Sequence, residues 1–121
     1  MPRDPDVPTA DELAACAADV RPLRCAELAD WLAAGRACTI VDVRTAGEFR
    51  SHRIPGARLV PLHELAARVD EVLALPGPLV VHCEHGIRSL DASVYLVWRG
   101  GRDVYNVVEG IAAWSGPLEQ G

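Results

Sequence analysis

Residues 79–89 read LVVHCEHGIRS, an apolar run that ends at Cys83 and leads through a glycine-containing loop into a helical pattern. This order predicts a buried strand, a short loop and the start of a helix. Backbone N–H groups of such a loop point inward, and the helix start adds a partial positive charge. Both favour the thiolate, which is the reactive form of cysteine. The stretch therefore predicts a nucleophilic Cys83 in an anion-binding cradle.

Apolar runs and helical patterns alternate on both sides of this stretch. Strands are expected at 20–23, 38–43, 58–60, 79–82 and 104–108, and helices at 10–18, 26–34, 62–75, 89–98 and 110–114. Residues 44–51 predict a polar turn or short helix, and residues 1–9 a flexible tail before one domain at 10–121. Such alternation indicates an α/β fold whose central parallel sheet has helices on both faces. Ligands bind such sheets at the carboxyl ends of the strands, where Cys83 falls.

Composition and charge argue against several classes of protein. The chain has 121 residues, half of them apolar, and a formal net charge of −5, so neither a nucleic-acid partner nor a membrane partner is expected. No apolar stretch approaches the ~20 residues of a membrane span, and the first residues lack the apolar core of a signal peptide. The expected location is therefore the cytoplasm. Cys16, Cys25 and Cys38 lack metal-ligand spacing and are interpreted as free, packed thiols, and no metal or organic cofactor is implied.

Three segments of the chain carry a family likeness. They are Val41-Asp42-Val43-Arg44 followed by Glu48-Phe49 and Ile54-Pro55-Gly56-Ala57; the loop Cys83-x-x-Gly86-x-Arg88-Ser89; and Tyr105-Asn106-Val107-Val108-Glu109-Gly110-Ile111-Ala112-Ala113-Trp114. In this order and separation the chain resembles the single-domain rhodanese sulfurtransferases over residues 20–115. Two positions depart from the family pattern. His52-Arg53 stand where Gly-His is usual, and Glu109 replaces the first of two paired glycines.

The resemblance implies a rhodanese-like fold and a persulfide mechanism. Cys83 would take a sulfane sulfur from thiosulfate or a persulfide donor and pass it to cyanide, a thiol or a sulfur-carrier protein. Backbone N–H groups of the loop would hold the outer sulfur. Arg88 would add a positive charge and brace the loop. The remaining members of the expected substrate-binding loop are Glu84, His85, Gly86, Ile87 and Ser89, the last with a hydroxyl able to cap the next helix.

Charged residues at the end of the strand expected at 38–43 and just after it are expected to support the site. Arg44 and Glu48 are spaced for an ion pair on the rim. Asp42 is expected to provide the anionic partner of Arg88, to order the loop, or to act only as a structural hydrogen-bond acceptor.

The side chains of Glu84 and His85 are expected to lie at the mouth of the cleft, where they would select among sulfur donors. A carboxylate at Glu84 would repel the thiosulfate dianion, and His85 would offset this as a hydrogen-bond donor or when protonated. Modest thiosulfate activity and a preference for a persulfide or protein donor are therefore expected. The alternative is that both side chains only face solvent.

Two other functions stay open at this point. Cysteine-based phosphatases and arsenate reductases of this fold begin their loop with His-Cys, as His82-Cys83 does, but place five residues before the arginine. Here four residues separate Cys83 from Arg88, and the tighter cradle suits a sulfur atom better than a phosphate. A non-catalytic binding module or a sulfur-relay module is the other alternative. Retention of Cys83, Gly86, Arg88 and Ser89 favours catalysis.

Overall fold

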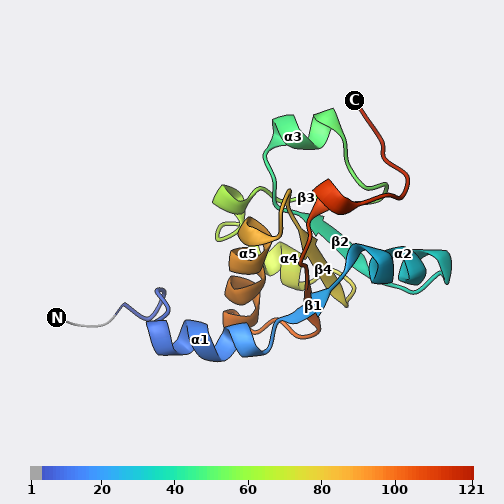
Figure 1. The fold of residues 1–121 in the computed structure, drawn as a ribbon. Helices are drawn as coiled ribbons and strands as arrows, with labels where there is room; N and C mark the ends of the chain where they lie inside the picture. The colour runs from blue at the N-terminus through green and yellow to red at the C-terminus, as the bar shows by residue number, and fades with distance from the viewer. Residues whose placement is uncertain (1–3) are drawn as a thin grey trace.

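The computed structural model describes residues 4–121, which fold around a five-stranded sheet (Figure 1). Its strands are β1 (Arg21–Leu23), β2 (Thr39–Asp42), β3 (Arg58–Leu59), β4 (Leu79–His82) and β5 (Val104–Val107). They lie in the order β1-β5-β4-β2-β3, and every neighbouring pair is parallel. The α/β fold with a parallel sheet is therefore confirmed.

Two hydrophobic cores lie on opposite faces of the sheet. One packs beneath α4 (Val69–Leu73) and α5 (Ile87–Trp98), and the other beneath α2 (Cys25–Ala33) and the 3₁₀ turn η2 (Ile111–Ala113). Strand β4 contributes to both, because Val81 faces the first core and Val80 the second. A central parallel strand buried on both faces needs an unbroken apolar run, which is why the sequence before Cys83 has no polar alternation.

Two further helices complete the fold. Helix α1 (Ala10–Ala18) lies along α5, where the Trp98 indole donates to a Glu12 carboxylate oxygen at 3.0 Å. Helix α3 (Ala46–Ser51) follows β2, and the C-terminal segment runs beside it (Figure 1).

The prediction of a single helix over residues 62–75 is wrong. A 3₁₀ turn η1 (Leu62–Glu64) and turns at 65–68 precede the short helix α4. The Arg68 guanidinium reaches back to the Leu59 carbonyl at 3.3 Å and to Glu64 at 3.1 Å, which holds the turn in place. Leu65, Val69 and Val72 are still buried, so the apolar spacing is satisfied without a continuous helix.

Smaller differences concern the ends of elements. Helix α5 begins at Ile87, two residues before the expected start, because Gly86 takes the left-handed cap position with φ +88°. The closing helix expected at 110–114 is the 3₁₀ turn η2. Residues 1–3 of the expected tail lie outside the described residues, and within 4–9 a turn joins the Val7 N–H to the Asp4 carbonyl ahead of the Thr9 cap of α1. Within residues 4–121, no helix is both long enough and apolar enough to cross a bilayer.

Candidate active site

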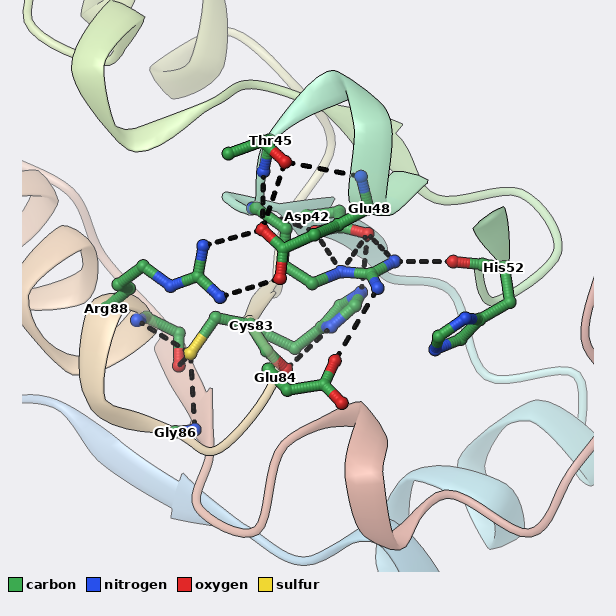
Figure 2. Close-up of polar contacts among 11 residues, drawn as sticks. Asp42, Thr45, Glu48, His52, Cys83, Glu84, Gly86 and Arg88 are labelled. Carbon is green, nitrogen blue, oxygen red and sulfur yellow. Dashed lines mark hydrogen bonds and ion pairs between the residues drawn. The ribbon is translucent and has the colours of Figure 1, made fainter. Parts of the chain in front are cut away.

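Cys83 lies directly after β4, at the carboxyl edge of the sheet, with 1% of its surface exposed. Its Sγ accepts from the Gly86 N–H at 3.2 Å and from the Ser89 N–H at 3.3 Å (Figure 2). Gly86 is required here, since its φ is +88° and a Cβ would lie 2.3 Å from the Val108 carbonyl oxygen. The loop is thereby pressed against the end of β5 with its N–H groups turned toward the sulfur.

The environment of Cys83 lowers the pKa of its thiol. Burial acts in the opposite direction, because it disfavours the charged form. The Ser89 side chain and the N–H groups of Ser89, His85 and Gly86 outweigh burial by hydrogen bonding to the thiolate. The N–H groups of Ile87 and Arg88, in the first turn of α5, have no acceptor within residues 4–121. The site therefore favours an anion at Sγ and offers further donors beyond it.

The Ser89 hydroxyl does not cap α5. It lies 3.3 Å from Cys83 Sγ and donates to the Asn106 side-chain oxygen at 2.5 Å. The Asn106 amide nitrogen in turn donates to the Gly86 carbonyl at 3.3 Å. Sequence reasoning assigned no role to Asn106, although an amide inside a strand whose other residues are apolar or aromatic is a signal for a specific buried partner.

Arg88 is paired with Glu48 rather than with Asp42. Its two terminal nitrogens donate to the two Glu48 carboxylate oxygens at 2.8 and 3.0 Å (Figure 2). The Arg88 guanidinium holds the pKa of Glu48 at about 2, against the smaller opposing effect of partial burial, and the Thr45 cap adds to the lowering. This pair joins the start of α5 to α3 across the site, and its two side chains are about one-third exposed, 37% and 32%.

The prediction of an ion pair between Arg44 and Glu48 on the rim is wrong. Arg44 is fully buried and binds Asp42, which is also fully buried. The Asp42 carboxylate accepts from the Arg44 Nε and Nη2 at 2.8–3.1 Å and from its backbone N–H at 3.0 Å. Arg44 Nη2 also donates to the His52 carbonyl at 2.7 Å. Asp42, the last residue of β2, and Arg44 thus form a buried ion pair beneath the site, and this pair is called the brace from here on.

Glu84 is drawn toward this brace and does not simply face the mouth of the cleft. Its carboxylate lies 3.7 Å from Arg44 Nη1, with 29% of the side chain exposed. His85 is exposed, and Ile87 is the most exposed large apolar residue of the loop, at 72%. The two neighbours of Gly86 therefore form most of the accessible loop surface.

His82, which precedes Cys83, is a fully buried residue of β4. Burial lowers its pKa, and the nearby Asp42 carboxylate opposes this only in part. Its Nδ1 lies 3.4 Å from the Cys83 carbonyl and its Nε2 3.6 Å from Asp42. The neutral imidazole packs behind the loop, which agrees with a structural role and not with that of a base.

Two of the residues that depart from the family pattern, Arg53 and Glu109, make specific contacts. Arg53 exchanges two backbone hydrogen bonds with Glu119, at 2.9 and 2.8 Å, and its guanidinium donates to the Gly121 carbonyl at 3.0 Å. It thereby fastens the C-terminal segment beside α3. Glu109 has no positive φ and accepts from the Cys25 N–H at 2.6 Å at the start of α2, whereas Gly110 keeps a φ of +71°.

Cys25 and Cys38 show no sign of a nucleophilic role. Burial raises the pKa of Cys25 to about 11, with the Glu109 charge adding to it, and the Cys25 thiol donates to the Gly110 carbonyl. Burial also raises the pKa of Cys38. A low-pKa thiol is therefore supported at Cys83 and not at these two positions.

Together, the fold and the cradle define an α/β protein with a cysteine at the carboxyl edge of a parallel sheet. Residues 25–117 match the model of the rhodanese-like domain, and the chain belongs to this family. It is 42% identical over 78 residues to the thiosulfate sulfurtransferase GlpE of Pseudomonas savastanoi, covering 62% of this chain and 70% of that protein.

Two further likenesses agree with this assignment. The chain is 31% identical over 90 residues to the uncharacterized protein YqhL of Bacillus subtilis, covering 74% of this chain and 71% of that one. It superposes on the crystal structure of a rhodanese-like domain protein from Staphylococcus aureus with a TM-score of 0.72 and 30% identity. That match covers 84% of this chain and 99% of the other.

Proposed function

We propose that this protein is a sulfurtransferase that moves a sulfane sulfur through a persulfide on Cys83. The observation that carries the proposal is the position of Sγ, which faces the N–H groups of Gly86 and Ser89 at the start of a helix. This arrangement lowers the pKa of the thiol, so a nucleophile is present without a general base. The four cysteines are free, which suits reaction in the reducing cytoplasm.

The reaction proceeds in two displacements. The Cys83 thiolate attacks the outer sulfur of thiosulfate, a bond between Sγ and that sulfur forms, and sulfite leaves with the electron pair of the broken S–S bond. The negative charge then lies on the outer sulfur, where the N–H groups of Ile87 and Arg88 are available to stabilise it. A cyanide or thiolate acceptor attacks that sulfur, and the Cys83 thiolate is the leaving group.

The charges around the cradle favour a donor other than thiosulfate. Arg44 is neutralised by Asp42 and Arg88 by Glu48. Glu84 is then a third carboxylate against two guanidinium groups, so the site carries one excess negative charge. We therefore propose modest use of thiosulfate and a preference for a persulfide donor of lower charge.

Glu84→Ala is expected to lower the KM for thiosulfate about two- to fivefold, because one like charge near a dianion is removed in a partly solvated site. Steady-state kinetics at low and high salt measure this, and the difference from the native protein should shrink at high salt. Glu84→Gln removes the charge but keeps the side-chain length, and it should show the same effect. An unchanged or higher KM in both variants would contradict the charge argument.

Arg88→Ala is expected to lower kcat/KM for sulfur transfer about tenfold, equivalent to ~1.4 kcal/mol. The variant removes a positive charge near the thiolate and the tie from α5 to α3. The pH midpoint for alkylation of Cys83 should rise. Arg99→Ala, at the exposed far end of the same helix, is the matched control. An unchanged kcat/KM in Arg88→Ala would show that Arg88 takes no part in sulfur transfer and is only a surface charge.

The experiment that tests the proposal is the intact mass of the protein after incubation with thiosulfate or with a persulfide donor. We expect a gain of one sulfur that a thiol reductant removes and that prior alkylation of Cys83 prevents. No adduct from any donor, with Cys83 still open to alkylation, would overturn the proposal in favour of a binding module.

A sulfur relay to a protein acceptor is a second candidate. Ile87 and Val108 are 72% and 41% exposed and flank Gly86, so apolar surface adjoins the nucleophile. A protein acceptor would cover this surface, whereas cyanide would not. The phosphatase alternative loses support, because the Arg88 guanidinium binds Glu48 instead of facing the cradle, where a phosphate would need it.

A further inference from the structure

A buried chain of hydrogen bonds runs from Cys83 to β5 and has no part in the displacements described above. Cys83 Sγ lies 3.3 Å from Ser89 Oγ, Ser89 Oγ lies 2.5 Å from Asn106 Oδ1, and Asn106 Nδ2 lies 3.3 Å from the Gly86 carbonyl. Ser89 is fully buried and Asn106 is 4% exposed. Solvent is therefore excluded, and the direction of each bond is decided by the groups themselves.

The directions follow from what each atom can donate. The Gly86 carbonyl only accepts, so the Asn106 amide nitrogen faces it and the amide oxygen faces Ser89. That oxygen also only accepts, so the single hydrogen of the Ser89 hydroxyl points to Asn106. Ser89 Oγ then presents a lone pair to Cys83. This arrangement suits a thiol, whose S–H donates to Oγ, and it opposes a thiolate.

We propose that Asn106 is a positioning residue that holds the Ser89 hydroxyl hydrogen away from Cys83, so that the hydroxyl turns to Sγ only while Sγ is an anion. When the thiol gives up its proton to solvent, the hydroxyl rotates and donates to the sulfur, and the Asn106 oxygen loses its donor. Asn106 therefore competes with the thiolate for one hydrogen.

The consequence for sulfur transfer rests on the proposed function. Once the bond to the incoming sulfur forms, Sγ is a neutral bridging atom and the charge lies on the outer sulfur. The Ser89 hydrogen then returns to Asn106. The competition thus favours both states in which Sγ carries no charge, the thiol and the persulfide, and it makes the intervening thiolate more reactive.

Other charged groups lie around Cys83, and the Asn106 and Ser89 variants tested below leave them unchanged. Arg88 of α5 and its partner Glu48 of α3 lie on one side, and Glu84 and His85 belong to the loop. Asp42 and Arg44 of the brace and His82 of β4 lie behind the loop. Strand β5 contributes Asn106 and no ionisable group in direct contact with the thiol.

The test is the pH dependence of Cys83 alkylation in Asn106→Leu, Ser89→Ala and the double variant. It measures the thiolate directly and requires no sulfur transfer, so it stands whether or not the sulfurtransferase proposal holds. Asn106→Leu should lower the midpoint by about 0.5 to 1 pH unit, the effect of one neutral hydrogen bond. In the Ser89→Ala background the same substitution should shift nothing. Tyr105→Phe, in the same strand, is the control.

A raised or unchanged midpoint in Asn106→Leu, or an equal shift with and without Ser89, would overturn the proposal and leave Asn106 as an anchor for Gly86. A second measurement needs no substitution at Asn106. At a pH below the alkylation midpoint, where Cys83 is a thiol, the infrared difference between the native protein and Cys83→Ser should show an S–H stretch at the low frequency of a donating thiol, and Ser89→Ala should raise it. A native stretch at the frequency of a free thiol would equally overturn the proposal.

Discussion

Cys83→Ser is expected to abolish persulfide formation and to reduce sulfur transfer by at least about a thousandfold, to the uncatalysed background. Oxygen in place of sulfur cannot form the persulfide, and a serine hydroxyl stays protonated where a thiol with a lowered pKa ionises. The fold should be kept, because the hydroxyl is slightly smaller and can still accept from the Gly86 and Ser89 N–H groups.

The measurements are transfer kinetics and intact mass, together with the denaturation midpoint as a check on folding. Cys38→Ser is the matched control, since Cys38 lies outside the cradle and burial raises its pKa. It should leave both transfer and the mass gain as they are in the native protein. Transfer that persists in a folded Cys83→Ser protein would place the nucleophile elsewhere.

Asp42→Ala is expected to lower the free energy of unfolding by about 3–5 kcal/mol, because it leaves the buried Arg44 guanidinium without its partner. Removal of one member of a buried ion pair costs the solvation of the other. Glu84, at 3.7 Å and partly exposed, offsets only part of this loss. Denaturant unfolding followed by tryptophan fluorescence measures the effect.

Arg21→Ala is the control for Asp42→Ala, because the Arg21 side chain makes solvent-exposed contacts with Asp103 and the Tyr105 hydroxyl, and their loss should change the free energy of unfolding much less. The double variant Asp42→Leu with Arg44→Met should recover much of the stability, since two apolar side chains then replace the pair. A loss below ~1 kcal/mol in Asp42→Ala alone would show that the brace contributes little to stability.

The strand before Cys83 and the loop after it were predictable because the information is local. An unbroken apolar run before Cys83 indicates a strand buried on both faces, and the glycine in the next four residues allows the tight loop. The resemblance to rhodaneses also rests on short segments, one of which is this loop. No contact between distant residues is needed for these conclusions.

The charge partners around the site were not predictable in the same way. Sequence spacing suggested Arg44 with Glu48, but Arg44 folds back on Asp42, and Glu48 binds Arg88, forty residues further along. Which carboxylate meets which arginine depends on the alignment of β2 with β4, where Asp42 lies opposite His82. Asn106 reaches Ser89 only because β5 lies beside β4 in the sheet.

Periodicity and short motifs were enough to derive from the sequence the α/β fold, the family and the strand-loop-helix setting of Cys83. The tertiary structure alone decided the pairing of Arg88 with Glu48, the buried brace of Asp42 and Arg44, and the contact of Asn106 with Ser89. Strand order and burial select these partners, and both are properties of the whole sheet.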